Sequence, residues 1–133
     1  MTLGRLCFVG VMAAVATARA DAPMPGDTEA NAKAFLVALR KAVEAKDPKQ
    51  LLQKDLAVFP LTVVQATRTE RVEPTEFISD YDEIFSARVT RAILGADVEH
   101  VSALRGELGG GAVHFSCVHH GKTCRFQITS VNP

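Results

Sequence analysis

The C-terminal stretch GAVHFSCVHHGKTCRFQITSV, residues 111–131, decides the fold class of this chain. Apolar and polar residues alternate on both sides of the central HHGK, as in two β-strands that each bury one face. If HHGK forms a four-residue turn, an antiparallel hairpin follows. Its predicted register pairs Val113 with Ile128, Phe115 with Phe126 and Cys117 with Cys124.

Cys117 and Cys124 lie opposite each other in this register, and we expect them to form a disulfide. The chain has three cysteines, and the third, Cys7, lies near its N-terminus. Two cysteines opposed across a hairpin are typical of a disulfide when the protein reaches an oxidising compartment. The alternative is a pair of free, buried thiols.

The turn between these cysteines carries His119 and His120, which makes the region a candidate metal site. Thiolate and imidazole ligands suit zinc or copper. The spacing C-x-H-H-x3-C is not a standard zinc pattern, however, and an oxidised cysteine pair cannot supply thiolates. We therefore expect no metal and no other cofactor.

The region before the hairpin begins with helical patterns. Asp27 or Thr28 can cap a helix that runs to about residue 46, with apolar residues at helical spacing. Asp47 and Pro48 predict the start of a second, short helix, because aspartate caps well and proline suits the first helical turn.

Residues 56–66 are rich in Val, Leu and Phe, and they predict a β-strand. Pro60 lacks an N–H, so this strand lies at a sheet edge or contains a bulge. Residues 67–72 form either its partner strand or a loop.

A single apolar stripe predicts a helical region over residues 74–94 that ends at Gly95. Ser79 and Asp82 resemble a capping box, so we expect the helix to restart there. From residue 97 onward the glycine-rich sequence predicts strands joined by turns. The order of elements indicates an α+β fold with helices packed on one face of a curved antiparallel sheet, in a single domain over residues 27–133.

The first 20 residues, MTLGRLCFVGVMAAVATARA, resemble a secretory signal peptide. One arginine precedes an apolar stretch, and Ala18-Arg19-Ala20 fits the A-x-A cleavage preference. The apolar stretch is about half the ~20 residues that a membrane span needs. We expect cleavage between Ala20 and Asp21, a flexible leader over 21–26, no membrane span after processing, and a periplasmic or secreted protein.

The composition argues against two classes of protein. The chain has 133 residues with 15 basic and 15 acidic side chains, so it lacks the basic excess that is usual in nucleic-acid-binding proteins. A hydrophobic content of 47% fits a globular chain and not a disordered one. Loss of residues 1–20 would remove two arginines, and the net charge would then be slightly negative.

Short apolar and glycine motifs extend over nearly the whole chain after residue 20. They are Phe35-Leu36 with Leu39 and Val43, Phe59-Pro60-Leu61, Phe77, Tyr81-Asp82, Ile84-Phe85, Gly106, Gly111, 113–115 and 128–132. In this order they resemble the nuclear-transport-factor-2-like superfamily, a cystatin-like cone made by a curved sheet around helices. The resemblance is to small, mostly uncharacterised exported bacterial proteins of that type. It implies a fold and a compartment, and it implies no reaction.

Tyr81 and Asp82 are the candidate catalytic residues, within an acidic run at 80–83. The superfamily includes ketosteroid-isomerase-like and dehydratase-like enzymes, which use acids, a tyrosine or a histidine inside the cone. In a catalytic interpretation Tyr81 donates a hydrogen bond and Asp82 acts as a base. In the alternative, Tyr81 belongs to the core and the acids are solvated. No catalytic motif of those enzymes can be matched here residue by residue.

Three functions follow as hypotheses. The first is an exported, non-catalytic binding or accessory protein that holds a small apolar ligand or docks an envelope protein. Its sheet face could also form an oligomer such as a dimer, and we expect no nucleic-acid partner. The second is an isomerase- or dehydratase-like enzyme that uses Tyr81 or Asp82. The third is an inhibitor or immunity protein for a secreted enzyme, with the HHGK hairpin tip as the inserted element. We favour the first, because no catalytic motif is recognised.

Overall fold

The structure, a computed structural model, describes residues 24–133. The predicted signal peptide, its cleavage site between Ala20 and Asp21, and most of the predicted leader lie outside the described residues. Within residues 24–133, no helix is both long enough and apolar enough to cross a membrane.

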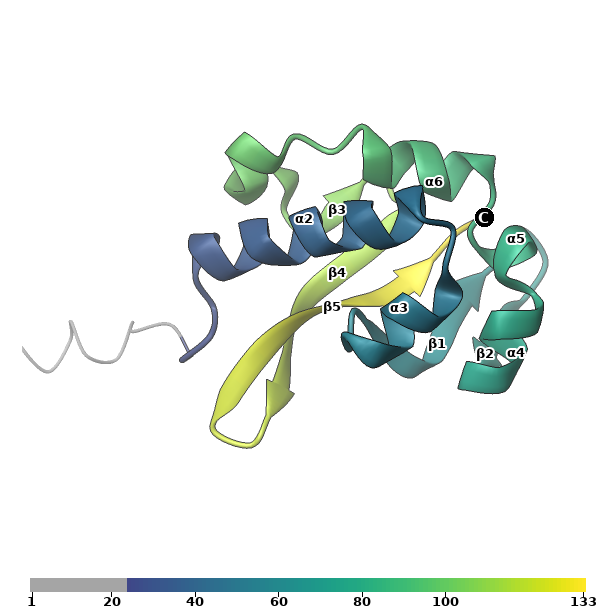
Figure 1. Ribbon diagram of the computed structural model, residues 1–133, viewed down its shortest axis with the longest axis horizontal. Helices are drawn as coiled ribbons and strands as arrows, with labels where there is room; N and C mark the ends of the chain where they lie inside the picture. The colour runs from purple at the N-terminus through teal and green to yellow at the C-terminus, as the bar shows by residue number, and fades with distance from the viewer. Residues whose placement is uncertain (1–23) are drawn as a thin grey trace, which may run out of the picture.

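The described chain forms helices first, then a hairpin, then more helices and a final set of strands (Figure 1). The helices are α2 (Glu29–Glu44), α3 (Pro48–Gln53), α4 (Pro74–Ser79), α5 (Tyr81–Ile84), α6 (Ala87–Leu94) and the 3-10 helix η1 (Val98–Leu104). The strands are β1 (Ala57–Val64), β2 (Thr69–Val72), β3 (Glu107–Leu108), β4 (Val113–His120) and β5 (Thr123–Val131). This arrangement confirms the α+β class.

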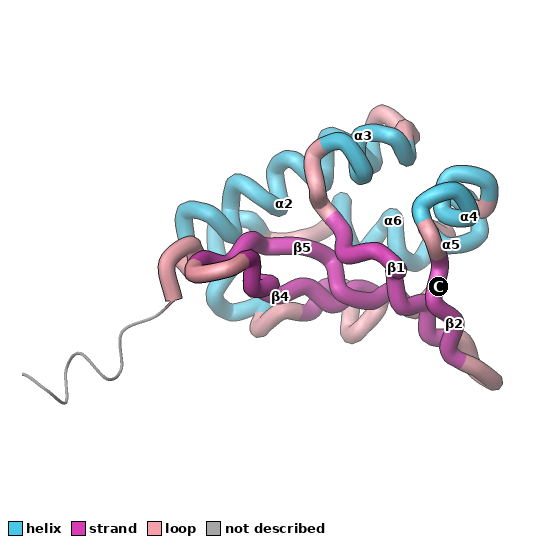
Figure 2. The backbone as a smooth tube through the Cα atoms, turned by 90° about the horizontal axis from the view of Figure 1, so that it is seen from below, coloured by secondary structure: helices cyan, strands magenta, loops and turns pink. Residues whose placement is uncertain are grey.

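The strands form one five-stranded sheet in the order β2-β1-β5-β4-β3. The expectation of an entirely antiparallel sheet is wrong, because β1 and β5 run parallel while the other neighbours run antiparallel. After β2 the chain forms helices α4, α5, α6 and η1, and then strands β3 and β4. The last strand, β5, lies next to β1 and runs parallel to it. Helix α2 runs along β5 on one side of the sheet (Figure 2).

The C-terminal hairpin forms as expected, but its register differs from the prediction by two residues from Phe115 outward and by three at Val113, which pairs with Val131. Phe115 pairs with Ile128 and Cys117 with Phe126, and the turn contains only Gly121 and Lys122. Gly121 has a φ of +68°, which suits the first position of a two-residue hairpin turn. From Phe115 outward, a shift of two residues leaves paired side chains on the same faces as predicted, because side chains alternate with a period of two.

The disulfide between Cys117 and Cys124 is present, with a Cα–Cα distance of 5.2 Å. The two cysteines are diagonal neighbours on one face and not directly opposed, since Cys124 pairs with His119. The prediction of the bond is therefore confirmed, although the register on which it was based was wrong.

Pro60 lies inside β1, which has sheet neighbours on both sides, so the edge-strand alternative is wrong and the bulge alternative is confirmed. The register between β1 and β5 shifts between Ala57 and Thr62, around the proline that cannot donate to the ladder. Residues 67–72 were expected to form either a partner strand or a loop, and Thr69–Val72 form the partner strand β2.

The helical region over residues 74–94 is broken twice. Asp80 and Phe85 leave helical geometry, and α6 begins after Ser86, whose hydroxyl accepts a hydrogen bond from the Val89 N–H at 3.4 Å. The predicted capping box at Ser79 and Asp82 is wrong, because α5 has no side-chain cap and the Ser79 hydroxyl donates to the Asp80 carboxylate at 3.5 Å.

Residues 98–104 form 3-10 turns with a kink at His100, whose φ is −118° and ψ is 46°, where strands were expected. Val98, Val101 and Leu104 recur every three residues, which matches the repeat of a 3-10 helix, and all three pack on the core. That spacing was the sequence signal that the strand prediction overlooked.

The space between helices and sheet is filled by the protein's own side chains. The largest fully buried ones include Phe77, Leu36, Leu39, Leu51, Leu61, Ile93, Leu108 and Ile128. No buried side-chain nitrogen or oxygen of the described residues lacks a hydrogen-bond partner. The larger open spaces therefore lie at the surface, around the ends of the elements.

Replacing Lys46 by glycine is expected to raise the free energy of unfolding by about 0.5–1 kcal/mol. Lys46 closes α2 with a φ of +52°, and its N–H and that of Asp47 bond back to Val43 and Ala42. The left-handed conformation costs an L-residue about 1–2 kcal/mol, and glycine avoids that cost at some loss of chain entropy. Urea unfolding measures the change. Lys46→Ala is the control, because alanine keeps the Cβ and should bring no gain.

Candidate functional site

Two open grooves meet at the outer half of the β4–β5 hairpin, where the N-terminal half of α2 lies above the strands. The first groove, about 490 Å³, lies between α2, the loop after α3 and the β5 edge. The second, about 410 Å³, lies between α2, η1 and β4. Phe126 of β5 lines both, and its ring is only partly buried. Volumes of this size are usual for small-ligand sites, about 300–1,000 Å³.

An aromatic cluster links the two grooves: Phe126 lines both, Phe35 lines the first and Phe115 lines the second. The ring of Phe35 on α2 lies 5.5 Å from Phe115 and 6.4 Å from Phe126, between ring centroids. Phe115 and Phe126 lie 6.4 Å apart. These contacts place an apolar surface at the bottom of both grooves.

A polar network adjoins the first groove, and its members Asp55, His120 and Arg125 line the groove. The Gln127 side chain, which is buried, donates to the Asp55 carbonyl at 3.0 Å and lies 2.9 Å from His120 Nε2. Arg125 donates to the Asp55 carboxylate at 2.8 Å. Lys54, beside them, is exposed and has no ion pair among residues 24–133. The positive charge that the groove leaves unneutralised is therefore that of Lys54.

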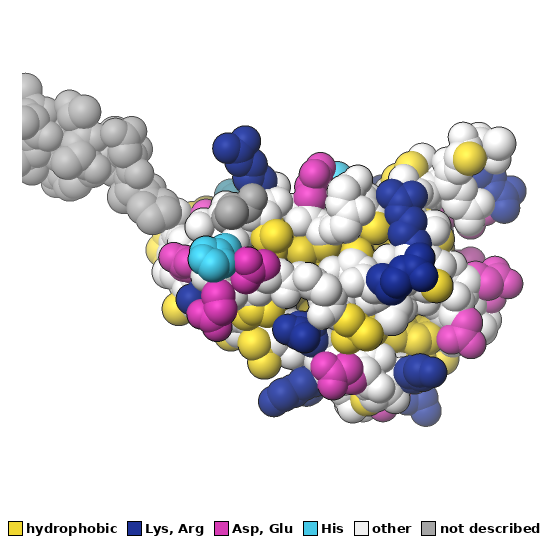
Figure 3. All heavy atoms as spheres, turned by 90° about the horizontal axis from the view of Figure 1, so that it is seen from above, with side chains coloured by type: hydrophobic (Ala, Val, Ile, Leu, Met, Phe, Trp, Pro, Cys, Tyr) yellow, Lys and Arg dark blue, Asp and Glu magenta, His cyan; other side chains and the backbone are white. Residues whose placement is uncertain are grey.

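The second groove is more apolar at its floor and mixed in charge at its rim. Ala32, Val101 and Phe115 line the floor, while Asp27, Glu29 and Arg105 lie at the rim. Figure 3 shows the helical side of the molecule, where basic and acidic side chains alternate with patches of apolar surface. No single charge sign dominates this side.

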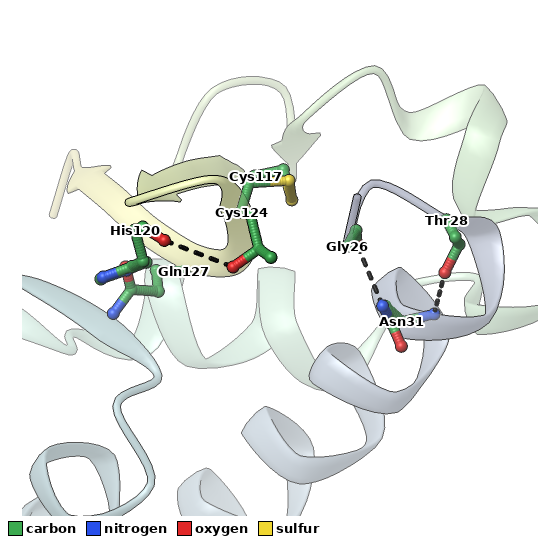
Figure 4. Close-up of a disulfide and its surroundings, with 8 residues drawn as sticks. Gly26, Thr28, Asn31, Cys117, His120, Cys124 and Gln127 are labelled. Atoms are coloured by element: carbon green, nitrogen blue, oxygen red, sulfur yellow. Dashed lines mark hydrogen bonds between the residues drawn. A yellow bond between two sulfur atoms is a disulfide. The ribbon is translucent and has the colours of Figure 1, made fainter. Parts of the chain in front are cut away.

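The start of the described chain borders the first groove. The Cys124 N–H donates to the Pro25 carbonyl at 2.8 Å. Asn31 donates to the Gly26 carbonyl at 3.0 Å (Figure 4). Gly26 has a φ of +98°, and a Cβ placed there would lie 2.1 Å from the Cys124 carbonyl oxygen. Only glycine allows the chain to pass this close to the disulfide-linked hairpin.

Tyr81 and Asp82 lie away from both grooves, at a separate hollow of about 300 Å³ between α2, α5 and α6. The Tyr81 ring is buried against Phe77 and Phe85, and its hydroxyl has no hydrogen-bond partner among the described residues. The Asp82 side chain is exposed. Asp82 is therefore in contact with solvent and lacks the enclosed, apolar surroundings that are typical of a catalytic base.

Burial raises the pKa of Tyr81 above its ordinary value of 10.0, and the nearby charges of Asp82 and Asp47 add to the effect. The chain has one tyrosine and no tryptophan, so its phenolate absorbance reports this residue alone. We expect the native midpoint to lie above that of the urea-unfolded chain. The resulting stabilisation is complete below about pH 10 and is lost as the pH rises through the folded-state pKa. An equal midpoint in both states would contradict this placement of Tyr81.

His119 and His120 are exposed at the hairpin tip, and His120 is hydrogen-bonded to Gln127. Both neighbouring cysteines are in the disulfide and cannot ligate a metal. Within the part of the chain that the structure describes, no group of three or more His, Cys, Asp or Glu side chains could hold a metal ion.

Sequence reasoning missed the residues that build the first groove. Gln127 was expected on the solvated face, and Asp55 and Lys54 were not considered. The contacts of Asp55 with Arg125 and Gln127 join residues 70 and 72 positions apart, so no local pattern shows them. The phenylalanine cluster was the available signal, because its members lie on the predicted apolar faces.

Comparisons with known proteins give no match: no family model, no curated protein and no solved structure is significantly similar to this chain.

Proposed function

We propose that this chain is an exported, non-catalytic binding or accessory protein of the cell envelope, periplasmic or secreted, that engages its partner at the two grooves of the β4–β5 hairpin. The observation that carries the proposal is the partly buried Phe126, which is shared by two open grooves of ligand-site size. An apolar floor with a few polar groups at the rim is the usual composition of a binding site.

We further propose a nuclear-transport-factor-2-like cone for the fold. The element order supports it: a helix pair, a hairpin, further helices and then antiparallel strands that curve past α2 (Figure 1). A ligand enclosed in the cone is not favoured, because the space between helices and sheet is filled by buried side chains. The partner would therefore bind from outside, at the hairpin.

An inhibitor or immunity function is the second candidate, and the hairpin tip favours it. His119, His120 and Lys122 are exposed, and the disulfide lies directly behind them. A rigid, exposed turn loses little conformational entropy when it binds. Enzyme action through Tyr81 and Asp82 is not favoured, because Asp82 is exposed.

The proposed export has a direct chemical test. The protein recovered from outside the cytoplasm should begin at Asp21 and should be two hydrogens lighter than its fully reduced form. The disulfide in the structure supports an oxidising compartment. N-terminal sequencing and intact mass measure both features. A chain that retains residues 1–20 and two free thiols would exclude export.

Capture from envelope extract tests the binding proposal. The exported protein, Lys54→Glu and Arg88→Glu are immobilised side by side. Lys54 lines the first groove, whereas Arg88 is exposed on α6 and undergoes the same change of charge outside both grooves. A partner retained by the exported protein and by Arg88→Glu but lost by Lys54→Glu supports the proposal. A partner lost only when His119 and Lys122 are changed to alanine indicates the inhibitor function, and no variant-sensitive capture excludes both.

A further inference from the structure

We propose that the partner presents an extended peptide segment, which pairs its backbone with the free edge of β5 at Phe126 inside the first groove. The inference rests on the proposed function, since it specifies how the same groove recognises its partner. Strand addition of this kind obtains affinity from main-chain hydrogen bonds and specificity from the adjacent side-chain pockets.

The free edge follows from the hydrogen bonds on either side of Phe126. The N–H groups of Cys124 and Ile128 point away from β4, because they donate to the Pro25 carbonyl at 2.8 Å and the Leu56 carbonyl at 2.9 Å. Alternate residues of a strand direct their backbone groups to the same edge, so the N–H and C=O of Phe126 also face this side. None of the described residues donates to or accepts from them there.

The described chain leaves this gap for structural reasons. The pairing of β1 with β5 begins only at Ala57, because the end of α3 turns the preceding residues away. The Asp55 and Leu56 N–H groups bond back to α3, which closes that turn. On the other side, the close approach of Gly26 to Cys124 ends the leader's contact one pair short of Phe126. The gap between Cys124 and Ile128 spans about 13 Å of strand.

The groove beside the gap specifies the side chains of the peptide. Phe35, Leu56 and Phe126 offer an apolar surface for one side chain. Arg125 is neutralised by Asp55, and Lys54 keeps a free charge at the rim. A peptide with an apolar residue next to an acidic one matches both features. A small apolar molecule would leave the Phe126 amide and the Lys54 charge unused, so an extended acidic–apolar peptide fits better.

Amide hydrogen exchange of the exported protein tests the free edge. We expect slow exchange at Cys124 and Ile128 and exchange at least about tenfold faster at Phe126, because only its N–H lacks a partner. The peptide acetyl-Glu-Val-Phe-Val-Glu-amide should slow the Phe126 amide and leave the other two unchanged. The same peptide with an N-methyl group on its central amide is the control, since it loses a main-chain donor and should not protect Phe126.

Charge variants test the recognition of the side chains. Lys54→Glu should weaken binding of the acidic peptide about fivefold, the size of an exposed ion pair. The same variant should bind better to a peptide in which lysine replaces both glutamates. Arg88→Glu should do neither. Slow exchange of Phe126 in the free protein, or equal protection by the N-methylated peptide, would overturn the inference. The proposed function is judged separately, because Lys54-sensitive capture from envelope extract can succeed even if these peptides fail.

Discussion

Replacing Phe77 by alanine is expected to lower the free energy of unfolding by about 3–5 kcal/mol, the range for a fully buried phenylalanine. Phe77 is completely buried, and its ring lies 5.3 Å from Phe59, 5.7 Å from Tyr81 and 5.6 Å from Phe85. The substitution removes the centre of this cluster and leaves a cavity that the surrounding helices and β1 cannot close. Urea unfolding followed by circular dichroism measures the loss.

Two matched substitutions separate cavity formation from general effects on the helix. Phe77→Leu keeps most of the apolar volume and should cost about 1–2 kcal/mol. The neighbouring Ile78 is 37% exposed, and Ile78→Ala should cost less than Phe77→Ala by several-fold. A domain of this size has about 5–15 kcal/mol of stability, so Phe77→Ala removes a large part of it. A loss below about 1 kcal/mol for Phe77→Ala would place Phe77 outside the core.

The apolar stripe over residues 74–94 predicted which residues are buried but not where the helices break. Tyr81, Ile84 and Val89 are buried as expected, because burial depends on periodicity, which survives short interruptions. The breaks at Asp80 and Phe85 depend on how three short helices pack around the end of the sheet. That is a tertiary effect, which the sequence pattern does not report.

In the C-terminal hairpin, too, the sequence pattern predicted burial better than it predicted the backbone arrangement. Hydrophobic alternation predicted the buried apolar residues of each strand, such as Phe115 and Ile128, but not the buried Gln127, and it allows any register that differs by two residues. The choice between registers depends on the turn, where Gly121 favours two residues over the predicted four. The irregularity between His114 and Phe115 then allows Val113 to pair with Val131.

The candidate site was less predictable than the fold. Phe126 could be placed beside the helices from its face, but the groove around it needs Lys54 and Asp55 from a distant loop. The direction of that loop depends on the left-handed Asp55, whose φ is +52°. No local pattern in the sequence shows that the loop at residues 54–55 lies beside β5, so the first groove became visible only in the structure.

Removing the disulfide by replacing both Cys117 and Cys124 with alanine is expected to lower the free energy of unfolding by about 2–3 kcal/mol. The two cysteines are 7 residues apart, and closing so short a loop in the unfolded chain accounts for roughly 2.5 kcal/mol in the chain-entropy model. Alanine avoids placing a hydroxyl at position 124, where the side chain is 8% exposed. Chemical reduction of the unmodified protein should give a similar loss, measured by urea unfolding.

The effect of the substitution on the structure should concentrate at the outer hairpin. The inner half of β5 is paired with β1 and β4. Among the described residues, the outer half from Thr123 to Gln127 has β4 on one side, and on the other it has one backbone hydrogen bond to Pro25 and side-chain bonds to Asp55. Without the bond, amide exchange should accelerate at Cys124 and its neighbours while Ile128 stays protected. The first groove would lose its fixed wall, and binding of the acidic peptide should weaken in the same variant. Uniform acceleration over all of β5 would show instead that the disulfide stabilises the whole sheet.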